Sequence, residues 1–194
     1  MAPFTLESFK RWNRRAVVSI FDWVSALVMS LCVIVIVMTF FFRTVGVDGD
    51  SMLPTLHHQD RLLMTVQNRS FDVGDIVVVD RYTEDSLVKR VVAKGGDTLT
   101  ITDSYHVYVN GELLEEPYTR GVTVPRDIKG PVVIPEGCYF VMGDNRTVSK
   151  DSRMNEIGII SEKDIVGKVV FRFWPLDSAG GVYFNMDSEE ANVQ

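Results

Sequence analysis

The feature that most constrains this chain is a run of 20 uncharged, mostly apolar residues from Trp23 to Phe42. A helix rises about 1.5 Å per residue, so the run spans about 30 Å, the thickness of a bilayer's hydrocarbon core. Buried helices of globular proteins are rarely as long and as apolar on every side. A cleavable signal peptide has a shorter apolar region, and here Arg43 follows the run directly. The sequence therefore predicts a retained transmembrane helix over residues 16–42.

The charges on either side of this run predict its orientation. Four basic residues precede it: Lys10, Arg11, Arg14 and Arg15. Arg43 is the single basic residue among the 17 that follow it. Because the flank richer in Lys and Arg stays on the cytoplasmic side, residues 1–15 are predicted to be cytoplasmic and residues 43–194 extracytoplasmic. We expect a single-pass protein of the plasma membrane, in contact with lipid.

The composition beyond the run narrows the possible functions. The first 42 residues contain four basic and two acidic residues, which leaves 16 basic and 24 acidic residues among the other 152. This acidic surplus argues against nucleic-acid binding. The two cysteines are 106 residues apart, which excludes a disulfide scaffold. No cluster of residues has the spacing of metal ligands, so we expect no metal site.

Short β-branched segments bounded by turn residues predict strands after residue 43. Seven segments have this pattern: Arg61–Val66, Asp75–Asp80, Leu87–Ala93, Thr98–Thr102, His106–Val109, Cys138–Met142 and Val166–Phe173. Asn110-Gly111 is typical of a type I′ hairpin turn, and the strand at 98–102 is expected to join that hairpin. The predicted fold class is therefore mainly β, with one transmembrane helix followed by a compact all-β domain.

The domain limits follow from the same patterns. The all-β domain is expected over residues 43–175, and residues 97–137 form a hairpin and an extended excursion within it. The excursion is rich in Pro, Gly and charge from residue 115 onward. Residues 176–194 are expected to be a C-terminal tail.

A serine that follows the predicted helix closely is a candidate nucleophile. Ser51 lies in the segment GDSMLPT, in which Gly49 permits a close backbone approach and Pro54 stiffens the exit of the turn. Such a turn exposes a serine beside backbone N–H groups that can stabilise an oxyanion. On this segment alone, an ordinary polar turn serine remains the alternative.

A serine nucleophile needs a base, and Lys89 is the best candidate. His57 and His58 are too close to Ser51 in sequence to fold back onto it, and His106 lies beside the predicted hairpin. In a strand, Lys89 shares a face with apolar neighbours, which is unusual for lysine. Burial there depresses the pKa of the amine, as a lysine base requires. A lysine at a sheet edge that extends its amine into solvent is the alternative.

A polar loop follows the apolar segment CYFVM. Residues 143–153 read GDNRTVSKDSR and contain two Asp, two Arg, one Asn and two Ser. This density is typical of a loop fixed by side-chain hydrogen bonds and Asp–Arg pairs. A solvated loop is the alternative when the segment is considered by itself.

The motifs are more specific together than separately. After one apolar helix the chain contains SMLPTL, KRVVAKGGD and GDNRTVSKDSR in this order, and GKVVFRFWP near the end. The combination resembles bacterial type I signal peptidases, and the short single-anchor form of Gram-positive bacteria is most similar. The resemblance covers residues 10–175 and implies a Ser–Lys peptidase domain that needs no metal and no cofactor.

The resemblance also implies roles for individual residues. Ser51 matches the nucleophile, Lys89 the general base and Ser149 the serine that orients the lysine amine. Four residues match structural positions that hold the polar loop against the site: Asp144, Arg146, Asp151 and Arg153. Gly49 stands where some members have a serine that donates to the oxyanion, so here the oxyanion hole is expected to use the Ser51 N–H and other groups.

The expected function is a membrane-bound serine endopeptidase that removes N-terminal signal peptides from exported preproteins. Apolar residues beside the motifs are candidates for shallow pockets that accept small side chains: Val45, Val47, Met52, Leu87 and Val88. Two alternatives share the fold. Self-cleaving transcriptional repressors have a DNA-binding domain for which this chain has no room. A degenerate pilus-assembly accessory protein would lack part of the dyad, whereas Ser51 and Lys89 are both present.

Overall fold

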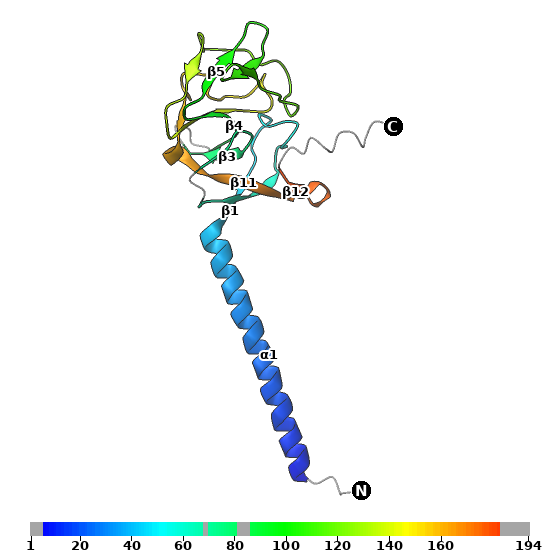
Figure 1. Ribbon diagram of the computed structural model, residues 1–194. Coiled ribbons are helices and arrows are strands. Elements are labelled where there is room, and N and C mark those ends of the chain that lie inside the picture. Colours follow the sequence, from blue (N-terminus) through cyan, green and yellow to red (C-terminus); the bar gives the residue numbers. More distant parts are fainter. Residues whose placement is uncertain (1–5, 68–69, 81–85, 183–194) are drawn as a thin grey trace. The chain divides into compact units, whose positions relative to one another are not determined.

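The computed structural model describes residues 6–67, 70–80 and 86–182 (Figure 1). The chain divides into two compact units, residues 1–42 and residues 43–194, which we describe in turn. The start of the predicted cytoplasmic segment (residues 1–5) and the end of the predicted tail (residues 183–194) lie outside the described residues.

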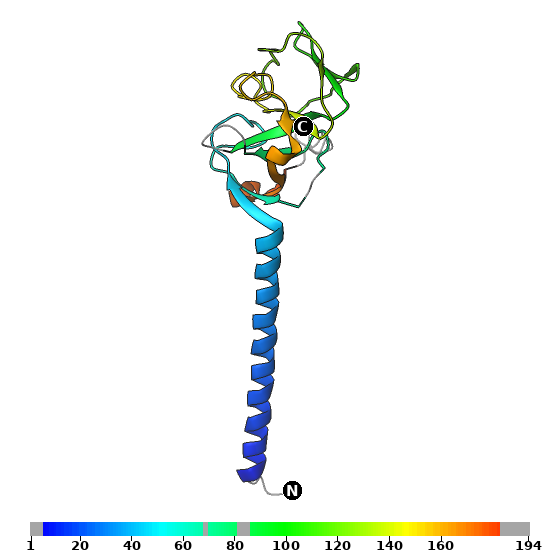
Figure 2. The same cartoon turned by 90° about the vertical axis from the view of Figure 1, so that its left-hand side faces the viewer.

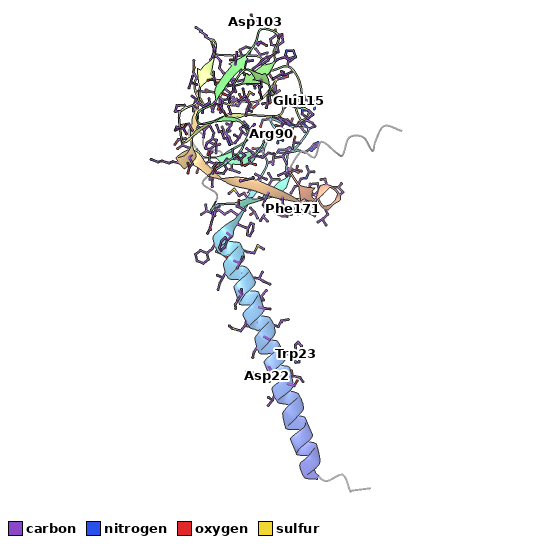
Figure 3. The ribbon with its side chains drawn as sticks, in the orientation of Figure 1. Asp22, Trp23, Arg90, Asp103, Glu115 and Phe171 are labelled. Carbon is purple, nitrogen blue, oxygen red and sulfur yellow. The ribbon has the colours of Figure 1, made fainter. Side chains whose placement is uncertain are left out.

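The first unit is a single long helix, α1 (Leu6–Phe41). Its segment Val18–Phe41 spans 24 residues, or about 36 Å, and is the one helix of the described chain with the length and composition to cross a membrane. The side chains of Asp22 and Trp23 project from this helix (Figure 3). The segment Val18–Phe41 lies within the predicted transmembrane helix over residues 16–42. The helix itself extends back to Leu6, because residues 6–15 contain no Gly or Pro to end it.

The described strands of the second unit form a large sheet and a small sheet. The large sheet has eight strands, and seven of them lie in the order β1-β2-β11-β3-β4-β9-β10, while β12 pairs with β11. Their bounds are β1 (Phe42–Gly46), β2 (Arg61–Thr65), β3 (Ile76–Val79), β4 (Leu87–Lys94), β9 (Cys138–Met142), β10 (Ile160–Ser161), β11 (Ile165–Trp174) and β12 (Gly180–Gly181). The ten-residue strand β11 pairs with both β2 and β3, so a late segment of the chain holds two early strands together.

The small sheet has four strands in the order β7-β6-β5-β8. Their bounds are β5 (Thr98–Ile101), β6 (Val107–Val109), β7 (Glu112–Leu113) and β8 (Val132–Val133). Asn110 and Gly111 connect β6 to β7 with φ values of 54° and 85°, as a type I′ turn requires. The predicted hairpin and its third strand are therefore confirmed. The small sheet lies at the end of the unit away from β11 (Figures 1 and 2).

Two short 3-10 helices complete the described elements. The helix η1 (Glu162–Asp164) has Ser161 as its N-cap, whose hydroxyl accepts a hydrogen bond from the Lys163 N–H. The helix η2 (Leu176–Ser178) and strand β12 occupy the start of the segment that the sequence assigned to a tail. This start is ordered because Arg172 donates a hydrogen bond to the Ser178 carbonyl and β12 pairs with β11.

Strand β4 connects the three apolar clusters of the core. Val88 belongs to a cluster with residues of β2, β3 and β11, whereas Val91 belongs to one with residues of β3 and β9. Val92 and Ala93 pack into the third cluster, with residues of the small sheet. A strand buried on both faces has little freedom to move, so β4 is a rigid support for the polar side chains that it carries. The predicted fold class, an apolar helix followed by a mainly β domain, is confirmed.

Candidate active site

The turn that carries Ser51 connects β1 to β2. Gly49 has a φ of +83°, a value that glycine adopts without strain. Met52 and Leu56 are almost fully buried in the core, and the Leu56 N–H donates to the Met52 carbonyl. The carbonyl of Ser51 accepts a 3.0 Å hydrogen bond from the Asn145 N–H. These contacts fix the backbone on both sides of Ser51, while its side chain stays half-exposed.

Lys89 meets Ser51 from the middle of β4. Its side chain is 3% exposed, and its Nζ donates to Ser51 Oγ at 2.8 Å and to the Val88 carbonyl at 2.9 Å. Burial lowers the pKa of Lys89 to about 8, against the opposing effect of the Asp151 and Asp144 charges. The amine is therefore neutral in part of the molecules at neutral pH. The structure thus brings together Ser51 and Lys89, which are 38 residues apart in sequence.

Arg90, the next residue of β4, is paired with Asp144 of the polar loop. Arg90 Nε and Nη2 donate to the two carboxylate oxygens at 2.9 and 2.7 Å, and Nη1 donates to the Gly74 carbonyl. The guanidinium lies 4.0 Å from the centre of the Tyr118 ring. Figure 3 labels Arg90 in the interior of the unit. The pair thereby fixes the polar loop to the strand that carries Lys89.

Thr55 connects the serine turn to the same pair. Its hydroxyl donates to Asp144 Oδ2 at 2.5 Å. We did not predict Thr55 as a site residue, although its place four residues after Ser51 within SMLPT is a signal that points to it. Through Asp144, the serine turn and the strand of Lys89 share one anchor.

Two further buried arginines hold the polar loop in shape. Arg153 Nε and Nη2 each donate at 2.8 Å to an oxygen of Asp151, and both residues are fully buried. Burial acts to raise the pKa of Asp151, but hydrogen bonds and the charge of Arg153 outweigh it and lower the pKa. The Gly143 N–H also donates to Asp151. The predicted supporting residues of this loop thus lie together in the interior.

Arg146 ties the loop to the excursion at residues 115–137. Its guanidinium donates to both carboxylate oxygens of Glu116 and, at 2.7 Å, to the Thr123 hydroxyl. Sequence reasoning missed Glu116 and Thr123, because ion pairs between distant segments leave no local pattern. The excursion is therefore part of the scaffold of the site.

Ser149 is fully buried beside the serine turn. A side chain at Gly143 would overlap the Ser149 hydroxyl and the Ser51 carbonyl oxygen, which shows how closely the three residues approach. Ser149 Oγ has no hydrogen-bond partner of acceptable geometry among the described residues, although it lies close enough to Asp151 to help lower the pKa of that carboxyl. Its predicted role in orienting the Lys89 amine stays a prediction.

A cavity of about 880 Å³ opens at the serine and the lysine. Its lining includes Gly49, Ser51, Leu53, Leu87, Lys89 and Asn145. Among the five residues expected to form substrate pockets, Leu87 lines this cavity. Val47, Met52 and Val88 belong to the core cluster, and Val45 is partly buried against it.

None of the three histidines lines the cavity at Ser51 and Lys89. His57 and His58 line a second cavity with Trp174, and His58 Nδ1 accepts a 3.2 Å hydrogen bond from the Gly49 N–H. His106 lies within hydrogen-bond distance of Ser104 at the hairpin. Within the described parts of the chain, no group of three His, Cys, Asp or Glu side chains is placed to hold a metal ion.

Comparisons with known proteins identify relatives of this chain. The family model "Signal peptidase, peptidase S26" matches residues 20–174. Signal peptidase I S of Bacillus subtilis is 37% identical over 171 residues, which cover 82% of this chain and 91% of the relative. Signal peptidase I of Bacillus licheniformis is 38% identical over 172 residues, with the same coverage. A crystal structure of a signal peptidase I from Enterococcus faecalis matches 51% of this chain and 96% of its own at 24% identity, with a TM-score of 0.42.

Proposed function

Because the chain belongs to the peptidase S26 family of signal peptidases, we propose that it cleaves its substrates with Ser51 as nucleophile and Lys89 as general base. The protein is a signal peptidase I, a membrane-anchored hydrolase that acts on exported preproteins with signal peptides. No relative favours the alternative of a degenerate pilus-assembly protein. The observation that carries the assignment of the dyad is the 2.8 Å contact between Lys89 Nζ and Ser51 Oγ.

The reaction begins when the Lys89 amine is neutral. Its lone pair accepts the Ser51 proton while Ser51 Oγ attacks the carbonyl carbon before the cleavage point. The resulting ammonium donates its proton to the leaving amine, and the signal peptide remains as an ester on Ser51. Lys89 then takes a proton from water, which attacks the ester, and returns it to Ser51 Oγ. The Val88 carbonyl keeps the amine in place throughout.

The oxyanion formed in each step needs hydrogen-bond donors. The Ser51 N–H donates to no acceptor among the described residues. It belongs to the nucleophilic residue itself, so it is close to the substrate carbonyl that Ser51 Oγ attacks. Gly49 offers no side-chain donor, and the space where its side chain would begin is open. We therefore assign the Ser51 N–H as one donor of the oxyanion hole.

The test is cleavage of a preprotein by the full-length protein in detergent or lipid vesicles. Ser51→Ala and Lys89→Ala should each abolish cleavage, because the nucleophile or its base is removed. Ser104→Ala, an exposed turn serine, and Lys94→Ala, an exposed lysine of the same strand, are matched controls that should keep full activity. Cleavage retained by Lys89→Ala and lost in His57→Ala or His58→Ala would replace the dyad with a histidine base.

We also propose that the N-terminus is cytoplasmic and that the β unit is extracytoplasmic, where preproteins emerge from the membrane. The basic residues before α1 support this orientation. In a variant whose Cys32 and Cys138 are replaced by Ser, an impermeant thiol reagent on intact cells should label Ser104→Cys and spare Ser8→Cys. The reverse labelling pattern would contradict the proposed orientation.

A further inference from the structure

Two cations line the same cavity as the dyad and form no ion pair with a described residue. Arg120 and Lys150 both contribute to the lining, both are exposed, and neither forms an ion pair within the described chain. The buried arginines around them are all paired with carboxylates. Acidic residues outnumber basic residues in this unit, yet neither Arg120 nor Lys150 is paired with one of the described carboxylates. Both cations are therefore available to an anionic group of a ligand.

The backbone that carries both cations is held in place. The Arg120 N–H donates to the Asp144 carbonyl at 2.8 Å, and the Arg120 carbonyl accepts from the Arg146 N–H at 2.9 Å. Lys150 lies between two fully buried residues, Ser149 and Asp151. A cation on a rigid backbone loses less conformational freedom when it binds an anion than one on a mobile loop.

Gly121 lets the Arg120 segment come this close to the polar loop. It has a φ of +79°, and a side chain there would overlap the Thr147 hydroxyl. Asn145 lies between the two sides of the cavity, because its N–H donates to the Ser51 carbonyl while its backbone pairs with that of Arg120. The lining also includes Asp50, so one exposed carboxylate and the two exposed cations Arg120 and Lys150 border the cavity.

We propose that Arg120 and Lys150 make this peptidase selective for charge near the cleavage site. An Asp or Glu of the preprotein within a few residues of the cleaved bond pairs with one of these cations, whereas a Lys or Arg there is repelled. The inference rests on the proposed function and adds a substrate preference to it. A solvent-exposed ion pair changes kcat/KM by about 2–5-fold.

The experiment uses the full-length protein in detergent and signal-peptide substrates that differ at a single residue. Asp, Asn and Lys are placed in turn at each position from four residues before to four residues after the cleavage site. At one or two positions, the Asp peptide should have a kcat/KM about 2–5-fold above the Asn peptide, and the Lys peptide should fall below it. The ratio should shrink in 0.5 M salt, because salt screens exposed charges.

Variants assign this preference to the two cations. At the selective positions, Arg120→Gln or Lys150→Gln should bring the Asp-to-Asn ratio to about one, and Arg120→Glu should reverse it in favour of Lys. Lys129→Gln, an exposed lysine away from the cavity, should leave both the ratio and the basal rate unchanged.

Two failures can be told apart. If the unaltered protein and all variants cleave the peptides with the same Asp-to-Asn ratio, the charge selectivity is refuted and the peptidase assignment stands. If the unaltered protein cleaves no peptide of the series, the proposed function fails and this inference fails with it.

Discussion

The two faces of strand β4 each carry a buried cationic side chain, and the surroundings of the two side chains differ. Lys89 and Arg90 are neighbours, and their side chains are 3% and 2% exposed. Arg90 has a carboxylate, a carbonyl and an aromatic ring around its guanidinium. Lys89 has a serine hydroxyl and one carbonyl around its amine, and it forms no ion pair with a described residue. On the face that carries Arg90, which we call the structural face, the buried cation is paired with a carboxylate in contact. On the face that carries Lys89, the reactive face, the charges of Asp151 and Asp144 act without an ion pair, and burial outweighs them.

This difference follows from the chemistry of the two side chains. A guanidinium cannot lose its proton in a protein, so a buried arginine must be paired. A lysine can lose its proton, and burial without a carboxylate favours the neutral amine. The reactive face therefore uses the instability of a buried ammonium to produce a base, whereas the structural face uses a stable ion pair to hold the loop.

Removing the buried Arg90–Asp144 ion pair of the structural face should have the largest effect on stability. Arg90→Met leaves the Asp144 carboxylate buried without its main partner, so the free energy of unfolding should fall by about 3–5 kcal/mol. Chemical unfolding of the full-length protein in detergent measures this change. Lys94 also lies on β4, and its ion pair with Asp72 is exposed. Lys94→Met should therefore change the free energy of unfolding by at most about 1 kcal/mol. Equal effects of the two substitutions would refute the contrast.

Replacing the buried cation of the reactive face should raise the free energy of unfolding instead of lowering it. The pKa of Lys89 is about 8 in the folded protein and close to 10.5 when the chain is unfolded. The unfolded state therefore binds the proton more tightly, and at pH 7 this difference costs the fold about 3 kcal/mol. Lys89→Met should abolish cleavage and raise the free energy of unfolding at pH 7 by up to that amount. The gain in the free energy of unfolding over the unaltered protein should shrink between pH 8 and 10.5, as Lys89 loses its proton in the unfolded state as well. A lower free energy of unfolding for Lys89→Met at pH 7 would contradict this prediction.

Local patterns were sufficient to predict the strand that carries both residues. The expected strand Leu87–Ala93 is found at Leu87–Lys94, because alternation and β-branching are properties of adjacent residues. The same pattern placed Lys89 among apolar neighbours but left open a lysine at a sheet edge, and the structure shows that Lys89 is buried. The pairing with Ser51, 38 residues earlier, was proposed because a serine nucleophile needs a base, and the resemblance to a family made that pairing specific.

Contacts between distant segments were beyond such patterns. The excursion at residues 115–137 has no periodicity, yet its Glu116 side chain pairs with Arg146, which lies 30 residues further along the chain. The tail expected from residue 176 begins instead with η2 and β12, because β11 supplies a partner strand. The apolar residues proposed as pockets show the same limit, since sequence alone did not separate Leu87 at the cavity from Val88 in the core.

A smaller effect on cleavage is expected from Ser149, which is fully buried beside the serine turn. If its hydroxyl positions the Lys89 amine, Ser149→Ala should lower kcat/KM by about 5–30-fold, the effect of one hydrogen bond. A shifted pH midpoint of kcat/KM would separate this role from a structural one. Ser152→Ala is the matched control, because the buried Ser152 hydroxyl accepts only the Val141 N–H. It should lower the melting temperature and leave the pH midpoint unchanged. An unaltered rate and midpoint in Ser149→Ala would remove Ser149 from the site.

The pH dependence of cleavage tests the role of the Lys89 amine most directly. Only the neutral Lys89 amine accepts the Ser51 proton, and with a pKa of about 8 about one tenth of the molecules have it at pH 7. The value of kcat/KM should therefore rise about tenfold from pH 7 to a plateau above pH 9, with a midpoint near 8. A carboxylate on the same face of β4 as the amine would raise that pKa, so Leu87→Asp, where folded, should move the midpoint upward. A midpoint near 6.5 that disappears in His57→Ala or His58→Ala would show that histidine is the base, and the contrast between the two faces of β4 would then have no role in catalysis.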